Sequence, residues 1–224
     1  MKLYISDLHF FHGNLLKGMD NRPFSSVDEM NDYIIEKWNE KVQGGDQVII
    51  LGDLFWTKDV QKINKILNKL KGQICLIKGN HDDSWLKKEG VNKDRFLWIK
   101  DYAEIEDKKR NVILSHYPIF CYNHQYLRNE DGTPRTFMLY GHVHNTHDEV
   151  LVNQFQNITR STVLKGSKEN RTIPCNMINC FCMFSNYAPL SLDEWIEVDA
   201  KRREALNNEE LTKNRDEQII KDEF

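Results

Sequence analysis

The sequence predicts an α/β fold of the α+β kind, in which two sheets are flanked by helices. Strand-like and helix-like segments alternate through the first half of the chain, whereas strand-like segments dominate the second half. That mixture fits two packed sheets with helices outside them. A chain of 224 residues can bury one sizeable core. We therefore expect a single domain over residues 1–206, followed by a strongly charged tail over 207–224.

Short apolar segments rich in β-branched and aromatic residues are predicted to be strands. The five that read as buried are Leu3–Ile5, Val48–Leu51, Ile74–Ile77, Val112–Leu114 and Phe137–Tyr140. Phe96–Ile99 and Tyr102–Ile105 are expected to be strands at hairpin spacing with Val112–Leu114. Late in the chain, Val150–Phe155 and Met177–Phe184 are also predicted to be strands. These segments suffice for two sheets.

Helices are expected between the early strands and at the end of the domain. The capping box Ser26-x-x-Glu29 precedes apolar residues at helical spacing, and Ser191-x-x-Glu194 opens a similar segment. The predicted helices cover residues 26–42, 59–71, 84–88 and 191–206. Two long irregular connections, 10–24 and 117–134, are expected near the strand ends, and loops of that length often carry function.

Side chains that can bind metals follow each of the five buried strands. They are Asp7, His9, Asp53, Asn80, His81, Asp82, His116, His142 and His144. Strand carboxyl ends line one edge of an α/β sheet, where ligands bind. Asp7 and His9 are two residues apart, as are His142 and His144, so in extended segments each pair should project together. Mixed nitrogen and oxygen ligands favour Mn, Fe, Zn or Co over Mg or Ca.

The order and spacing of these clusters resemble a known family signature. Asp7-x-His9, Gly52-Asp53, Gly79-Asn80-His81-Asp82, His116 and Gly141-His142-x-His144 resemble the calcineurin-like metallophosphoesterase superfamily. Further stretches resemble small bacterial and phage phosphohydrolases: His9–Asn14, Arg22-Pro-Phe24, Trp38-Asn39, Asn186–Pro189 and Leu192-Asp-Glu194. The resemblance covers most of residues 1–200 and implies a four-layer αββα sandwich of two mixed sheets flanked by helices.

The resemblance also implies two divalent transition-metal ions, Mn foremost, with Fe, Zn, Co or Ni as alternatives. It assigns Asp7, His9 and His144 to the first ion. Asn80, His116 and His142 belong to the second, and Asp53 bridges the two. The chemistry agrees, because a bridging ligand needs two oxygens that carry lone pairs, and Asp53 is the available carboxylate.

His81 follows the expected ligand Asn80 and is our candidate for the general acid, or for a cationic stabiliser of the transition state. Asp82 is expected to orient it. A turn whose side chains bond to the backbone is the structural alternative for this Asn-His-Asp sequence.

His12 and Arg22 are candidates for contacts with the substrate, because both lie in the segment that follows the first strand. An arginine suits bidentate phosphate binding. The alternatives are a loop histidine that bonds to the backbone and an arginine that ties down Pro23 and Phe24. The residues alone do not decide between these readings.

The leading functional hypothesis is a phosphoesterase that hydrolyses a phosphomonoester or phosphodiester with a hydroxide formed between two metal ions. A nuclease or cyclic-nucleotide phosphodiesterase on the same centre is the alternative within enzymes. A degenerate protein-binding scaffold is disfavoured, because every position of the pattern holds a competent side chain. The net charge of −3 gives no general attraction to nucleic acid or membranes. We expect a small phosphate ester or a nucleotide as substrate.

The chain has no apolar run long enough to cross a bilayer, and its first predicted strand begins at Leu3, so we expect no signal peptide. Its five cysteines are an odd number, which argues for reduced thiols and a cytoplasmic location. Cys180 and Cys182 have apolar neighbours and the wrong spacing for common zinc motifs, so we expect them to be packed strand residues.

Overall fold

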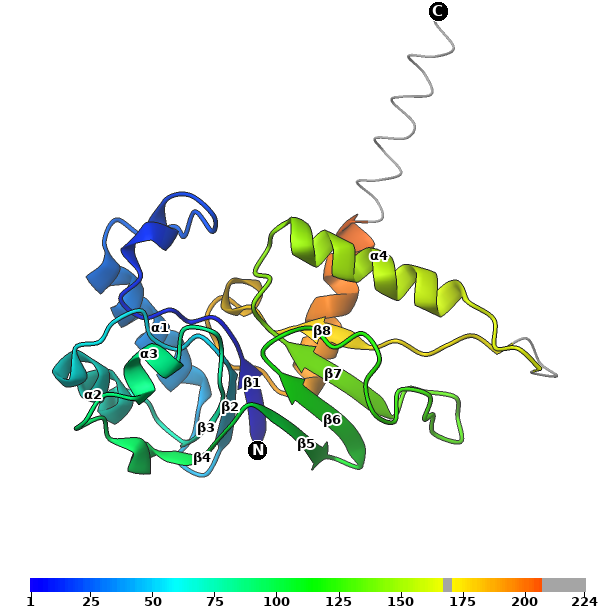
Figure 1. Ribbon diagram of the computed structural model, residues 1–224, viewed down its shortest axis with the longest axis horizontal. Helices are drawn as coiled ribbons and strands as arrows, with labels where there is room; N and C mark the ends of the chain where they lie inside the picture. Colours follow the sequence, from blue (N-terminus) through cyan, green and yellow to red (C-terminus); the bar gives the residue numbers. More distant parts are fainter. Residues whose placement is uncertain (167–170, 207–224) are drawn as a thin grey trace, which may run out of the picture.

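The computed structural model describes residues 1–166 and 171–206, which form two four-stranded sheets with helices outside them (Figure 1). The first sheet has the order β1-β2-β3-β4, with strands Lys2–Ile5, Gln47–Leu51, Gln73–Ile77 and Phe96–Lys100. The second has the order β5-β6-β7-β8, with strands Tyr102–Asp107, Arg110–Ser115, Thr136–Tyr140 and Met177–Asn179. The first sheet is parallel throughout, and in the second only the β5–β6 pair is antiparallel.

Helices cover the outer faces of both sheets. They are α1 (Val27–Lys41), α2 (Val60–Lys69), α3 (Asp83–Leu86), α4 (His147–Ser161) and a C-terminal helix described over 192–206. Short 3₁₀ helices cover Gly13–Leu16, Lys93–Arg95 and Cys182–Ser185. Ser26 caps α1 by accepting a hydrogen bond from the Glu29 backbone amide, as the sequence predicts. No helix in the described part of the chain is both long and apolar enough to span a membrane.

Alternation along the strands divides the core into three layers of side chains. Leu3, Ile5, Val48 and Ile50 face α1 and α2, where they meet Met30, Ile34, Trp38, Ile63 and Leu67. Tyr4, Ile49, Leu51, Cys75 and Ile77 face the second sheet, where they meet Val112, Leu114 and Leu139. Ile113, Met138 and Tyr140 face α4. This is the αββα layering expected from the sequence, with the correction that only the second sheet is mixed.

Two of the strand predictions are wrong. Residues 150–155 belong to α4, which Thr146 caps and which carries Asp148 and Glu149 in its first turn. Its buried positions include Val152 and Gln156, which are one helical turn apart, whereas strand alternation would bury every second residue. The predicted strand 177–184 ends at Asn179 and is followed by a 3₁₀ helix.

The expected hairpin of Phe96–Ile99 with Tyr102–Ile105 is also wrong. These segments form β4 and β5, which lie in different sheets, so the chain passes from one sheet to the other at Asp101. The hairpin is formed by β5 and β6 instead. The predicted tail, 207–224, lies outside the described residues, and all five cysteines are free thiols.

Trp195 joins the C-terminal helix to the first strand. Its side chain is fully buried, and its indole N–H donates a 2.8 Å hydrogen bond to the backbone carbonyl of Tyr4. Substituting Phe removes the donor and leaves a buried carbonyl without this partner. We expect Trp195→Phe to lower the free energy of unfolding by about 1–3 kcal/mol, measured by urea denaturation. Trp98→Phe, at a partly exposed position in β4, is the control and should change it by less.

Candidate metal centre

All seven side chains predicted to bind metal lie at the carboxyl ends of five strands, where the two sheets meet. Asp7 and His9 follow β1, Asp53 follows β2, and Asn80 follows β3. From the second sheet, His116 follows β6, and His142 and His144 follow β7. Most of them are buried, with Asp7, His9, Asp53, His116 and His144 each at most 3% exposed.

The first group of potential ligands consists of Asp7, His9 and His144, whose ligand atoms all lie within 4.8 Å of one another. The Nε2 atoms of His9 and His144 are 3.3 Å apart, and His144 Nε2 lies 3.6 Å from Asp7 Oδ1. Burial and the neighbouring His144 lower the pKa of His9 well below its usual range, so this imidazole is neutral at physiological pH. Neutral imidazole is the form that binds a metal.

The second group lies beside the first and shares Asp7 with it. Ligand atoms of Asp7, Asp53 and His116 also lie within 4.8 Å of one another. Asn80 Oδ1 lies 3.0 Å from both His116 Nε2 and His142 Nδ1. The Asp53 Oδ2 atom lies 3.6 Å from His9 Nε2 and 3.6 Å from His116 Nε2, so this carboxylate stands between the two groups.

The proton positions of two histidines show that this donor set fits cations. His116 Nδ1 lies 2.8 Å from the carbonyl oxygen of Leu51, which can only accept, so Nδ1 carries the proton and Nε2 presents a lone pair. His144 Nδ1 lies 2.7 Å from a carboxylate oxygen of Asp20, which sets the same tautomer. Each Nε2 atom faces an oxygen of another potential ligand, Asn80 Oδ1 for His116 and Asp7 Oδ1 for His144, so a cation between them would be bound by both.

The charge of the two aspartates supports the same conclusion. Burial and the nearby Asp7 carboxylate raise the pKa of Asp53, against the opposing effect of His116. Two buried carboxylates at this separation disfavour each other's ionised form. Divalent cations between them would stabilise both charges.

The backbone at the ligand positions differs from the extended conformation expected from the sequence. Asp7, His9, Asp53, His142 and His144 have φ between 47° and 71°, in the left-handed region. Each such residue costs about 1–2 kcal/mol, and residues of this kind cluster at functional sites. The two ligands of each pair are therefore brought together by sharp turns after the strands, and not by the alternation of side chains along an extended strand.

Two glycines in the signature are explained by close approach to these ligands. Gly52 has φ of +95°, and a Cβ there would lie 2.2 Å from Nδ1 of His116. A Cβ at Gly79 would lie 2.2 Å from Oδ1 of Asp53. Any larger residue would displace a potential ligand, so glycine precedes Asp53 and Asn80 for steric reasons.

Asp82 positions the loop that carries Asp53 and does not contact the His81 ring. Its fully buried carboxylate accepts hydrogen bonds from the amides of Asp53, Leu54 and Gly79, at 2.8–3.0 Å, and from the indole of Trp85. Burial raises the pKa of Asp82 to about 6, although these donors oppose the shift. The role of orienting His81, expected from the sequence, is not supported by these contacts.

His81 lies at the open side of the centre. Its side chain is 37% exposed, and its Nε2 atom is 3.8 Å from Asp53 Oδ2. The ring of Trp56 meets it edge to face, with centroids 4.4 Å apart. His12 stacks on the same indole at 3.8 Å with an interplanar angle of 3°, and burial lowers the pKa of His12 to about 4. Trp56 therefore holds both histidines at the rim.

Sequence reasoning passed over Trp56 and Tyr117, which flank the centre on two sides. Trp56 is 43% exposed, and Tyr117 is 48% exposed. Tyr117 packs edge to face against His142, with ring centroids 4.5 Å apart. The sequence does give one signal for them, which is their position: Trp56 lies three residues after Asp53, and Tyr117 directly follows His116. Large aromatic side chains that are exposed beside a site contribute to its binding surface.

Arg22 is buried under the metal centre and faces away from solvent. Its guanidinium donates to the backbone carbonyls of Asp7 and Leu8, at 2.9 and 2.8 Å, and its Nε donates to Asp20 at 2.9 Å. These contacts favour a role in holding the loop after β1 over the substrate contact considered from the sequence. The alternative from the sequence, an arginine that ties down Pro23 and Phe24, names a different segment from the one that Arg22 binds, which is Asp7 and Leu8.

Asp20 is a functional candidate that the sequence did not reveal. Its carboxylate connects His144 to Arg22, and its side chain is only 1% exposed. Burial opposes ionisation, but the hydrogen bond and charge of His144, together with Arg22, lower the pKa of Asp20. A single aspartate in a loop gives no sequence signal for such a contact, which depends on the fold returning the loop to β7.

Comparisons with known proteins identify the family of this chain. Residues 1–162 match the calcineurin-like phosphoesterase superfamily domain, and the chain belongs to that superfamily. Membership indicates hydrolysis of phosphoric esters with divalent metals. The resemblance identified from the sequence motifs is therefore confirmed at the level of the family.

Individual relatives extend over most of the chain. An uncharacterized protein of Methanocaldococcus jannaschii, MJ1445, is 34% identical over 203 residues, which cover 89% of this chain and 92% of that protein. The gene 66 protein of Mycobacterium phage D29 is 28% identical over 163 residues, covering 63% of this chain and 77% of that one. The crystal structure of AQ665 from Aquifex aeolicus, a protein of unknown function, shares the fold, with a TM-score of 0.59, 23% identity and coverage of 88% and 98%.

The Asp20–His144 hydrogen bond generates a test of this geometry. Asp20→Asn keeps an acceptor for Nδ1 but removes the charge that holds the tautomer and pairs with Arg22. We expect Mn²⁺ affinity, measured by isothermal titration calorimetry, to fall about 10- to 100-fold. Asp28→Asn, in the exposed first turn of α1, should leave the affinity unchanged. Equal affinities for the two variants would contradict the role given to Asp20.

Proposed function

We propose that this protein is a metallophosphoesterase that hydrolyses a phosphate ester at a centre of two divalent transition-metal ions. The observation that carries the proposal is the convergence of two ligand groups that share Asp7, with the Asp53 carboxylate 3.6 Å from an imidazole nitrogen of each. Mn is our first choice for this mixture of donors, and Fe, Zn, Co and Ni have compatible ligand preferences.

The ligands divide into two sets around Asp53. Asp7, His9 and His144 would hold one ion, and Asn80, His116 and His142 would hold the other, with Asp53 as the bridging ligand. When bound, the two ions supply positive charge to a phosphoryl oxygen and acidify the attacking water. The residues of the chain then have to orient the substrate and move one proton.

His81 is suited to protonate the leaving oxygen. It is exposed at the mouth of the centre, within 3.8 Å of the Asp53 carboxylate, and its ring is held by Trp56. A protonated imidazole there would donate from Nε2 to the departing alkoxide, or stabilise its charge. His12, on the other side of Trp56, would contact the substrate in its neutral form, which its stacking at the rim and its lowered pKa support.

Cleavage of a phosphodiester in a nucleotide is a second candidate reaction. One observation favours it, because the half-exposed rings of Trp56 and Tyr117 stand on two sides of the metal ligands, where a base could stack. Monoester and diester hydrolysis would share the same ions, so the substrate alone distinguishes them.

Loss of the bridging ligand should abolish activity. We expect Asp53→Asn to reduce Mn²⁺-dependent hydrolysis of p-nitrophenyl phosphate and bis(p-nitrophenyl) phosphate by more than about 100-fold, because outer ligand partners alone contribute about 10- to 100-fold. Chelation of the wild type should remove the activity, and added Mn²⁺ should restore it.

Asp32→Asn is the matched control, because its carboxylate lies on the exposed face of α1. Circular dichroism should show that both variants are folded. Normal turnover by Asp53→Asn, or by the wild type after complete removal of metal, would reject the mechanism. The better substrate of the pair would decide between monoester and diester hydrolysis.

The role of His81 can be tested through the leaving group. His81→Asn should slow hydrolysis of an alkyl phosphate by about 10²- to 10⁴-fold, because an alkoxide needs protonation as it departs. The loss should be smaller for p-nitrophenyl phosphate, whose leaving group is stable as an anion. Equal losses would favour the cationic stabiliser over the general acid, and unchanged rates for both esters would contradict either role.

A further inference from the structure

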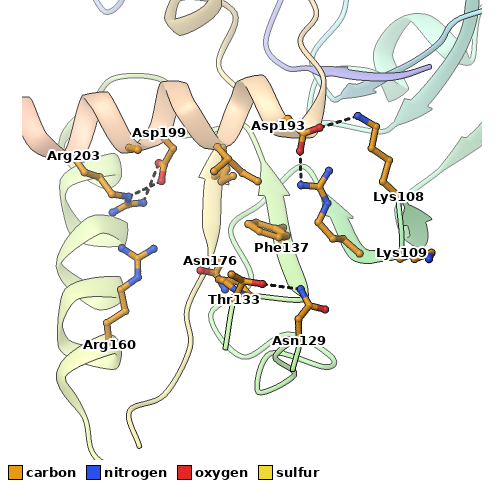
Figure 2. A pocket seen from close by; sticks show the side chains of 15 residues that line it. Lys108, Lys109, Asn129, Thr133, Phe137, Arg160, Asn176, Asp193, Asp199 and Arg203 are labelled. Carbon is orange, nitrogen blue, oxygen red and sulfur yellow. Dashed lines mark hydrogen bonds and ion pairs between the residues drawn. The ribbon is translucent and has the colours of Figure 1, made fainter. Parts of the chain in front are cut away.

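A cavity lies away from the metal centre, between the second sheet, the C-terminal helix and the last turn of α4 (Figure 2). Its volume is about 780 Å³, within the range of sites for nucleotide-sized ligands. The ring of Phe137 lies at the middle of it in Figure 2, and Ile178 and Ile196 add further apolar surface. The cavity therefore has an apolar floor.

This cavity and the metal centre lie at opposite ends of the same strands. Arg110 begins β6 and Phe137 lies at the start of β7, whereas His116 and His142 follow the ends of those strands. The six residues of β6 span roughly 20 Å. A ligand in the cavity would not touch the potential metal ligands.

Positive charge exceeds negative charge around the cavity. Its basic side chains are Lys108, Lys109, Arg110, Arg160 and Arg203, and its acidic ones are Asp193 and Asp199. Asp193 accepts from Lys108 and Arg110, at 2.8 and 2.6 Å. Asp199 accepts two hydrogen bonds from Arg203. Five basic groups against two acidic ones leave an excess of three positive charges.

Two of the guanidinium groups are incompletely neutralised. Arg160 donates to the carbonyl of Cys175 at 2.7 Å and to the amide oxygen of Gln156 at 3.1 Å, and both of these acceptors are neutral. Burial and the neighbouring Arg203 lower the pKa of Arg160. Arg110 lies over the Phe137 ring, and its buried Nε has no hydrogen-bond partner. An anion in the cavity could satisfy these groups.

The turn that brings two lysines to the rim is strained. Lys108 and Lys109 form the two-residue loop between β5 and β6, with φ of 49° and 65°. Such a loop favours Asn-Gly, because both residues need positive φ. No residue in the described part of the chain forms an ion pair with Lys109. Strained residues of this kind cluster at ligand-binding sites, and Lys109 adds an exposed cation to the lining of the cavity.

We propose that this cavity binds an organic phosphate of nucleotide size. The ring system of the ligand would lie against Phe137, Ile178 and Ile196, and its phosphate would be bound by the basic groups of the rim. On the side opposite the C-terminal helix, Asn129 donates its amide N–H to Thr133, and its amide oxygen can accept a hydrogen bond from a polar edge of the ring (Figure 2). The site is independent of the phosphoesterase activity.

Calorimetry with AMP tests the proposal on the full chain. The protein would carry Asp53→Asn and be kept in EDTA, so that the probe is neither hydrolysed nor bound through metal ions. We expect saturable binding of one AMP per chain, at least about tenfold tighter than adenosine or inorganic phosphate. Arg160→Gln should weaken it about tenfold, and Lys109→Gln about threefold.

Lys65→Gln, an exposed lysine on α2, is the matched control and should leave AMP affinity unchanged. Within residues 1–166 and 171–206, the Lys109 side chain has no hydrogen-bond or ion-pair partner, so its variant should fold normally and decides the question if Arg160→Gln is unstable. Absence of saturable AMP binding would overturn the proposal. So would binding that is insensitive to Lys109→Gln, or phosphate that binds as tightly as AMP.

Discussion

Two carboxylates and several imidazoles are buried together where the strands of both sheets end, and the surrounding structure is arranged to hold them. Asp7 and Asp53 approach each other in a region from which water is largely excluded, so their charges need compensation. Part of it comes from backbone amides, because the amide of His142 donates to Asp7 and the amide of His81 donates to Asp53. The two loops themselves are held by Asp82, which accepts amides of the Asp53 loop, and by Arg22, which donates to carbonyls of the Asp7 loop. Bound cations would balance the negative charge that remains on these carboxylates.

Geometry at the centre comes from the turns that follow the strands. Left-handed residues at Asp7, Asp53 and His142 redirect the chain immediately after each strand, so that side chains from both sheets reach one volume. Glycines at 52 and 79 leave the space that those side chains occupy. Backbone strain of this kind persists only where the packed core over-determines the conformation. The three layers of apolar side chains provide that rigidity, which a catalytic centre requires.

Much of this arrangement was predictable from the sequence. The buried strands and the helices that begin with capping boxes lie where the sequence patterns predict them. The potential metal ligands that follow five of the strands lie together at one site. The failures have physical causes. The β-branched residues of segment 150–155 favour a strand, yet the Thr146 cap and the burial of Val152 and Gln156 on one face make it a helix. The left-handed ligand positions gave no clear signal, because Asp and His adopt that conformation more often than most residues with a Cβ but still far less often than the other allowed conformations.

By itself, the sequence determined most of the strands and helices and the set of potential metal ligands, because periodicity and residue type are local properties. Only the tertiary structure decided which distant groups meet. Asp20 reaches His144 across 124 residues, Trp56 lies between His12 and His81, and the cavity at Phe137 is closed by the C-terminal helix. Such contacts depend on how the sheets and loops pack, and no spacing along the chain encodes them.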